Sequence, residues 1–204
     1  MTEKELSLSD ALAFGWNAMK TNLWFFVVTF LILVVITCAQ SLLTSGGSFV
    51  SFIFLLAFYA INLIVGMGII KISLKLVDGQ KPEYSDLYSS YPLFWSYLGG
   101  SILFGIMACI GYMLLIIPGI IISLQFGLFG YLVVDKGSAA ISSLQQSSKV
   151  TNGAKWKLFG LALLSIFINI VGLLCLGIGL IATIPTTIVA WAYAYRKLLA
   201  QTSI

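Results

Sequence analysis

The chain of 204 residues is 60% hydrophobic and only 9% charged, and its mean hydropathy is +1.05. This composition excludes a soluble globular domain and is typical of a polytopic membrane protein. The formal net charge of +4 is spread along the chain, a pattern that does not support nucleic-acid binding. Function is therefore to be sought in the bilayer or at its surface.

Residues 1–22 predict an interfacial helix ahead of the first apolar run. Ser7 or Ser9 can cap this helix, and Asp10 then lies in its first turn, where the helix dipole favours an anion. Apolar residues recur at intervals of three to four, which defines one face: Leu8, Leu12, Trp16, Met19 and Leu23. We expect this helix to lie on the membrane surface, and the alternative is that it continues the first membrane span.

Three long apolar runs predict three helical hairpins, at about 23–75, 93–135 and 156–199. The middle run has no charged residue from Leu87 to Val134, and its length suits two crossings of about 20 residues each. We expect its turn at Pro118–Gly119, between spans at 94–117 and 120–134. The turns of the other hairpins are expected at 44–48 and 177–179. The fold class is therefore all-α, with six transmembrane helices in one membrane domain, residues 1–204.

Short polar segments before the second and third hairpins predict further cytoplasmic interfacial helices. Ser85 is expected to cap the first of these, which Pro92 limits, and Ser138 is expected to cap the other. Each hairpin is thus preceded by a capped surface segment. The recurrence suggests a three-fold internal repeat, with the hairpins packed around a common pseudo-axis.

The distribution of basic residues predicts the topology. All 11 Lys and Arg residues fall before residue 21, within 71–81 and 136–157, or at the C-terminal end, whereas the three opposite turns have none. By the positive-inside rule, both termini and the two long loops are cytoplasmic.

Several motifs in order resemble a broad family of bacterial membrane proteins, which includes YciC-like inner-membrane proteins and the membrane domain attached to some glycerophosphodiester phosphodiesterases. The motifs are Ser9–Trp16, Leu114–Ile121, Tyr131–Asp135, Ser142–Lys149 and Gly153–Gly160. The resemblance implies a six-helix, multi-pass protein of the bacterial cytoplasmic (inner) membrane. It supplies no catalytic motif, and because the chain has no soluble phosphodiesterase domain it does not imply hydrolysis.

The spans do not contain the residues that catalysis or metal binding would need. The sequence has no histidine, no paired aspartates within a span, no Walker A motif and no Gly-x-Gly-x-x-Gly run. Cys38, Cys109 and Cys175 lie in apolar segments without ligand-like spacing. We therefore predict a protein that is not an enzyme and has no cofactor.

Three groups of residues are candidates for binding or assembly. Asn62, Gln125 and Asn169 form a candidate intramembrane polar site, for which interhelical hydrogen bonding is the alternative interpretation. Ser101, Gly105 and Cys109 form a helix-packing stripe of small residues, which we expect to pack within the monomer, with a subunit contact as the alternative. Lys149, Lys155, Trp156 and Lys157 form a basic rim, a candidate site for anionic lipid headgroups; the same lysines are also explained by orientation of the hairpin alone.

The leading hypothesis is a non-catalytic membrane protein that binds membrane lipids, with anionic headgroups favoured, or a membrane-protein partner or second copy. The alternative is a small permease or oligomeric pore for a neutral, amphipathic or peptide substrate. In that alternative, Gln125 and Asn169 lie in the substrate path.

Overall fold

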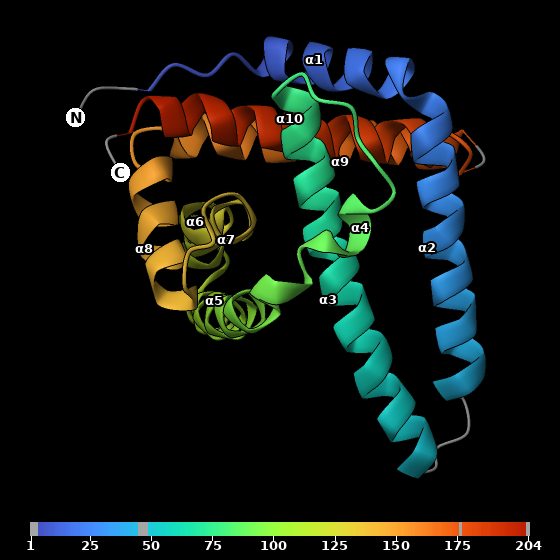
Figure 1. The fold of residues 1–204 in the computed structure, drawn as a ribbon. Coiled ribbons are helices and arrows are strands. Elements are labelled where there is room, and N and C mark those ends of the chain that lie inside the picture. Colours follow the sequence, from blue (N-terminus) through green and yellow to red (C-terminus); the bar gives the residue numbers. More distant parts are fainter. Residues whose placement is uncertain (1–3, 45–48, 176, 203–204) are drawn as a thin grey trace.

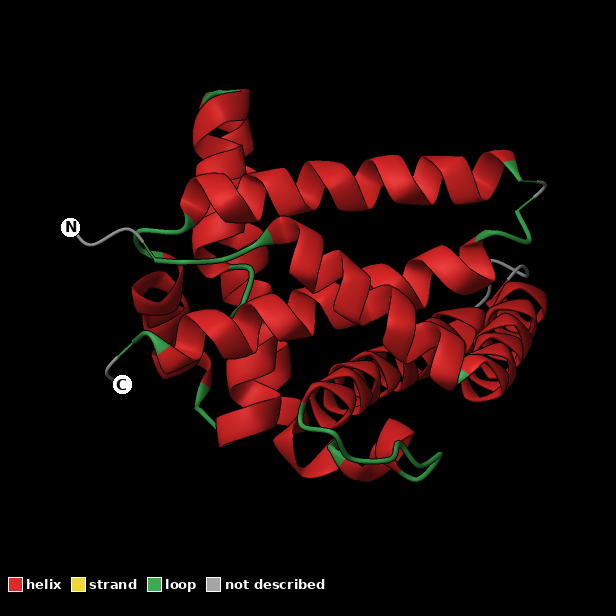
Figure 2. Ribbon diagram, turned by 90° about the horizontal axis from the view of Figure 1, so that it is seen from above, coloured by secondary structure: helices red, strands yellow, loops and turns green. Residues whose placement is uncertain are grey.

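The computed structural model describes residues 4–44, 49–175 and 177–202, and every regular element in these ranges is helical (Figure 2). The elements in chain order are α1 (Leu8–Thr21), α2 (Leu23–Thr44), α3 (Phe49–Val77), α4 (Asp86–Ser89), the 3₁₀ turn η1 (Tyr91–Leu93), α5 (Phe94–Leu114), α6 (Ile116–Phe126), α7 (Phe129–Lys136), α8 (Ala140–Thr151), α9 (Lys155–Leu174) and α10 (Leu180–Ala200). The predicted all-α class is confirmed.

The long helices pair into hairpins that point in different directions from a common junction. In Figure 1, α2 and α3 run downwards, α9 and α10 run across the view, and α5 is seen end-on beside α6. Among the described residues, five stretches are long and apolar enough to cross a membrane: Leu23–Thr44, Phe49–Val77, Asp86–Leu114, Ile116–Lys136 and Lys155–Leu174. These spans support a multi-pass membrane protein. Most of the predicted first turn, 45–48, lies outside the described residues.

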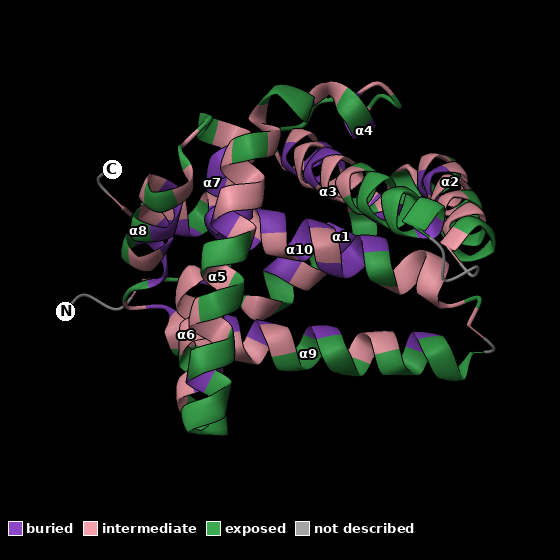
Figure 3. Cartoon of the chain, turned by 90° about the horizontal axis from the view of Figure 1, so that it is seen from below, coloured by how far each residue is buried: buried purple, intermediate pink, exposed green. Residues whose placement is uncertain are grey.

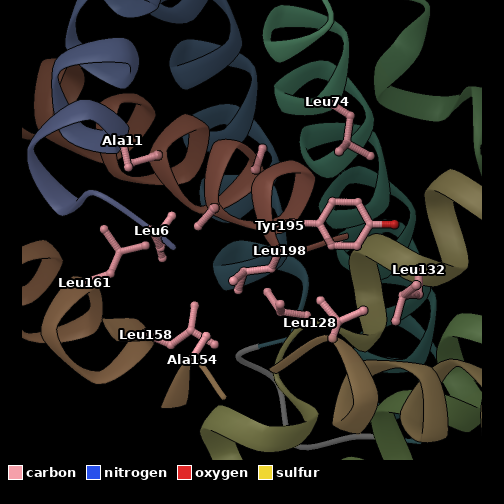
Figure 4. Close-up of a cluster of buried hydrophobic side chains, with 14 residues drawn as sticks. Leu6, Ala11, Leu74, Leu128, Leu132, Ala154, Leu158, Leu161, Tyr195 and Leu198 are labelled. Carbon is pink, nitrogen blue, oxygen red and sulfur yellow. The ribbon is translucent and has the colours of Figure 1, made fainter. Parts of the chain in front are cut away.

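The sixth expected span corresponds to α10, which is less apolar than the other five and forms the centre of the molecule. It contacts α1, α2, α3, α8 and α9. Its buried residues are Pro185, Thr186, Thr187, Val189, Ala190, Ala192, Ala194, Tyr195 and Leu198. Figure 4 shows Tyr195 and Leu198 of this helix among buried leucines from α3, α7 and α9. The core is thus built around α10, and the outer faces of α5 and α9 remain largely exposed (Figure 3).

The surface helices pack in a cyclic order. α1, which precedes the first hairpin, packs along α10 of the third; α4 packs on α3 of the first, and α8 packs on α5, α6 and α7 of the second. Glycines allow two of these contacts, because a Cβ on Gly15 would overlap the carbonyl of Thr186 and a Cβ on Gly68 would overlap that of Leu87. The three-fold internal repeat itself stays a prediction.

The face that α1 buries differs from the expected one. Ser7 caps the helix as predicted, since its Oγ accepts a hydrogen bond from the Asp10 backbone N–H at 3.3 Å. The buried residues are Ala11, Gly15 and Met19, of which only Met19 belongs to the expected stripe. Leu8 and Leu12 of that stripe are partly buried against the core, whereas Trp16 and Leu23 are exposed. Trp16 is 45% exposed, and the Lys20 ammonium lies 5.7 Å from the centre of its ring.

The caps expected for the two inner surface helices do not form. Ser85 precedes α4, but its Oγ donates to Glu83 Oε2 at 3.0 Å instead of accepting a backbone N–H. Ala139 is the N-cap residue of α8, one position after the predicted Ser138, whose Oγ hydrogen-bonds to Gln146 Oε1. A serine hydroxyl that finds a side-chain partner is no longer needed at the helix end.

The turn of the middle hairpin comes before Pro118, which corrects the expected turn at Pro118–Gly119. The chain reverses at Leu115, whose backbone is extended (φ −167°, ψ 157°), and Pro118 and Gly119 lie near the start of α6. Proline is tolerated there because the first turn of a helix lacks partners for its N–H groups in any case. The expected fourth span is also interrupted, since α6 ends at Phe126 and α7 begins at Phe129.

Candidate functional site

The three candidate polar residues of the membrane spans do not form one site. Asn62 Nδ2 donates to Gln40 Oε1 of α2 at 3.3 Å, and Asn169 Nδ2 donates to Thr187 Oγ1 of α10 at 3.4 Å. Gln125 lies near the start of α9, where it contacts Lys155. Asn169 is 14 residues beyond Lys155 on the same helix, which separates the two positions by roughly 21 Å at 1.5 Å per residue. Asn62 and Asn169 thus make the interhelical hydrogen bonds of the alternative interpretation.

The stripe of small residues on α5 faces outwards. Gly105 and Cys109 are exposed, and a Cβ added to Gly105 would meet open space. Close approach within this hairpin occurs instead where Gly111 faces Gly119. The stripe therefore does not pack against another helix within the described chain, and its role in subunit contact stays a prediction.

Gln125 and the basic rim, which are separate candidates in the sequence, come together at the junction of α6, α8 and α9. Lys155 Nζ donates to Gln125 Oε1 at 2.8 Å, and Gln125 Nε2 donates to Ser148 Oγ at 2.7 Å. The hydroxyl groups of Ser147 and Thr151 both donate to the Gln125 carbonyl oxygen at 3.0 Å. The polar face of α8 therefore holds the end of α6, and this fixes the side chain that orients Lys155.

A lysine from the N-terminal segment extends the rim. Lys4 Nζ donates to the carbonyls of Lys149 and Val150 at 3.1 and 2.7 Å, and Lys157 Nζ donates to the Lys4 carbonyl at 2.8 Å. The last carbonyls of α8 have no intrahelical partner and lie at the negative end of its dipole, so an ammonium is stabilised there. Burial lowers the pKa of Lys4. Sequence analysis missed this residue, since nothing local in the sequence links Lys4 to α8.

Within the described part of the chain, the side chains of Lys4, Lys149, Lys155 and Lys157 have no carboxylate partner. Among the described residues, no Asp or Glu oxygen lies within 4 Å of Lys4, Lys149, Lys155 or Lys157. Elsewhere, Lys75 Nζ lies 2.7 Å from the buried carboxylate of Asp86, whereas Lys20, Lys81, Lys136 and Lys197 also lack a carboxylate within 4 Å among the described residues but are spread over separate elements. The junction of α8 and α9 is therefore a concentrated positive site.

An apolar groove opens beside this positive site, between α6 and the first turn of α9. It has a volume of about 430 Å³ and is lined by Ile117, Ile120, Ile121, Leu124, Lys155, Trp156 and Phe159. From Ile117 to Leu124 it follows α6 for roughly 10 Å. Lys155 and Trp156 line it from the first turn of α9, and Trp156 is 84% exposed. We call this feature the α6–α9 groove.

A second charged cluster, which sequence analysis also missed, ties the three hairpins together. Arg196 of α10 binds Asp78 after α3 through two hydrogen bonds of 3.0 and 2.7 Å, and its Nη1 lies 2.7 Å from Asp135 Oδ2 of α7. Tyr195 Oη also donates to Asp135 Oδ2, at 2.8 Å. Each charged residue stands at the end of its hairpin's second arm, and that recurrence was the available sequence signal. The cluster is a structural tie, in which one guanidinium is shared by two carboxylates.

The described residues contain no group of three or more His, Cys, Asp or Glu side chains that could hold a metal ion. Cys38, Cys109 and Cys175 are free and exposed on the hairpins. No family model, curated protein or solved structure matches the chain. The spans and the fold define the class of protein, which is an all-α protein with the features of a multi-pass membrane protein.

Proposed function

We propose that this chain is a non-catalytic integral protein of the bacterial cytoplasmic membrane that binds lipids through its helix bundle and its basic rim. The observation that carries this proposal is the gathering of Lys4, Lys149, Lys155 and Lys157 at the junction of α8 and α9, with no carboxylate partner among the described residues and with the exposed Trp156 beside them. Basic residues near an anionic membrane surface gain about 1 kcal/mol each, and tryptophan favours the same interfacial depth.

In the proposed topology α10 is a sixth span, paired with α9, and both termini are cytoplasmic. The N- and C-terminal segments support this, because they lie side by side, with Lys4 Nζ bonded to Thr202 Oγ1 at 2.7 Å (Figure 1). The motif order that resembles the YciC-like family supports the bacterial inner membrane as the location. A membrane partner or second copy remains part of the proposal through the outward-facing stripe on α5.

The permease or pore hypothesis has less support. Gln125 and Asn169 lie far apart, and each has a protein partner, so they do not outline a common path. Gln125 instead orients Lys155, which belongs to the lipid-binding proposal.

The test is native mass spectrometry of the protein released directly from its membranes. We expect the wild type to retain anionic phospholipid at a fixed stoichiometry, and the variant K149Q/K155Q/K157Q to lose it. The matched control is K81Q/K136Q/K197Q, which removes the same charge from lysines that also lack carboxylate partners among the described residues. Equal retention by the two variants, or a defined homo-oligomer without lipid, would contradict the proposal.

A further inference from the structure

We propose that one anionic phospholipid binds in the α6–α9 groove, with an acyl chain between α6 and α9 and its phosphate on Lys155. This inference rests on the proposed lipid-binding function and assigns it to one site. It assigns the acyl chain to the α6–α9 groove, the headgroup to Lys155, and the positioning of Lys155 to a neighbouring side chain.

The walls of the groove suit an acyl chain. The four residues that α6 contributes are branched aliphatic side chains, and Phe159 closes the α9 side. Its volume of about 430 Å³ is in the range of small-molecule pockets, roughly 300–1,000 Å³. Such walls offer no hydrogen-bond partner, so a polar ligand would lose its hydrogen bonds on entering, whereas a hydrocarbon chain would not.

The direction of the groove matches that of a lipid in the cytoplasmic leaflet. Ile117 stands near the uncharged tip of the second hairpin, and Leu124 stands next to Gln125, which binds Lys155. A chain that follows α6 towards Ile117 therefore has its headgroup at the level of Lys155. This places the apolar and charged parts of one phospholipid against matching parts of the protein.

Lys155 is oriented and retains free donors. An ammonium has three N–H donors, and Gln125 Oε1 accepts one of them at 2.8 Å. The side chain has no other hydrogen-bond partner among the described residues, so two donors remain for phosphate oxygens. Gln125 is itself held by Ser148, which makes it a positioning residue for the headgroup site.

Charge favours a lipid over a second copy of this chain. An occupant must bring an anion to Lys155 while burying an apolar segment. The apolar hairpin tips of this chain have no acidic residue, so a tip from another copy has no anion for Lys155. A phospholipid with a net negative headgroup supplies both parts in one molecule.

The experiment uses the full chain in phosphatidylcholine vesicles that contain a trace of a phospholipid with a photoactivatable group in its acyl chain. The probe is either phosphatidylglycerol or phosphatidylcholine, and cross-linked positions are mapped by peptide mass spectrometry. We expect the phosphatidylglycerol probe to label 117–124 and 156–159 about fivefold more than the phosphatidylcholine probe, the factor that corresponds to about 1 kcal/mol for one charge near a membrane. K155Q should remove this preference, and K136Q should keep it.

Three further variants, at two positions, test the acyl-chain site and the positioning residue separately. Ile121, 45% exposed, faces the groove, so I121W should fill it and abolish labelling there. Q125L should lower the preference for phosphatidylglycerol because Lys155 loses its partner, and Q125E, which keeps a bond to the ammonium but adds a negative charge, should lower it further.

The outcomes separate this inference from the broader proposal. If native mass spectrometry finds retained anionic lipid but the probe labels other helices, the groove assignment is wrong and the lipid-binding function stands. Equal labelling by the two probes in the wild type would show that the groove takes chains without selecting a headgroup, which overturns the role of Lys155. A bifunctional protein cross-linker that joined peptides of two copies at the groove would identify a second copy as the occupant. If inorganic phosphate abolished labelling, the site would bind an anion without needing an acyl chain, which contradicts the lipid assignment.

Discussion

Helices α5 and α10 have the same length, 21 residues, and opposite relations between polarity and burial. α5 contains no charged residue and is long enough to span a membrane, yet it buries only Gly100 and Gly111. α10 contains Arg196 and Lys197 and three threonines, and it is the central helix of the fold. In a soluble protein the more apolar helix would be the more buried.

This reversal indicates that the solvent around α5 is hydrocarbon. In lipid, an apolar side chain gains little by packing inside the protein, while polar groups must find partners there. Two of the three threonines of α10 follow this rule, since Thr186 Oγ1 donates to the Ala182 carbonyl at 2.7 Å and Thr187 Oγ1 donates to that of Ile184 at 2.9 Å; the buried Thr183 Oγ1 has no such partner among the described residues. The two helices together thus favour the multi-pass arrangement more strongly than hydropathy does alone.

A charge placed on the exposed face of α5 tests the contrast between α5 and α10 most directly. We expect I106D to prevent stable insertion, because an aspartate at the centre of a membrane helix costs about 2.5–3.5 kcal/mol. Ile141 of α8 is the matched control: Ile106 is 53% exposed and Ile141 is 63% exposed, but Ile141 lies outside the candidate spans. The folded, membrane-inserted fraction measures the effect. Similar insertion of I106D and I141D would mean that α5 faces water.

The same contrast explains how much of the fold could be predicted. Apolar run lengths predicted the class and six spans, five of which are candidate spans among the described residues, since any helix in lipid must keep its backbone bonds internal. The turn at Leu115 and the break at Gly127 were not predictable, because they depend on how α5 and α8 pack against this segment. The buried face of α1 was predicted only in part: Met19 is buried as expected, but a stripe of large side chains left out Gly15, which the close contact with α10 requires.

Contact with α10 can be tested through glycines. G15A should destabilise the protein by about 2 kcal/mol, because the added Cβ would overlap the carbonyl of Thr186 and force α1 and α10 apart. G105A on α5 is the control, since its Cβ meets open space and alanine is favoured over glycine in a helix by up to about 1 kcal/mol. Thermal unfolding in detergent or nanodiscs measures both. A G15A variant as stable as G105A would contradict the packing of α1 on α10.

The candidate site was predictable in its parts and not in its assembly. Lys155 and Trp156 were identified from their position at a membrane edge, and Gln125 was identified as a polar residue in an apolar run. Their meeting depends on α8, whose Ser148 lies 23 residues from Gln125 in sequence. The role of Lys4 depends on contacts across about 145 residues, which a local pattern does not contain. The rim residues could therefore be predicted from their residue types and positions in the sequence, whereas the groove could be recognised only in the folded structure.

The smallest expected effect concerns the charged end of α10. R196Q removes the tie between the three hairpins and leaves Asp78 and Asp135 without their cation. Because all three side chains are partly exposed, at 16–37%, the cost should be about 1 kcal/mol, well below the 3–5 kcal/mol of a fully buried pair. K197Q is the control, since Lys197 only lies over the ring of Tyr193, at 5.7 Å. Thermal unfolding should show a lower midpoint for R196Q alone, and raised salt should narrow the gap between the variants. If R196Q and K197Q have the same unfolding midpoint at every salt concentration, the hairpins are held by packing on α10 alone. The polar groups that matter for the central position of α10 would then be its threonines and not its ion pairs.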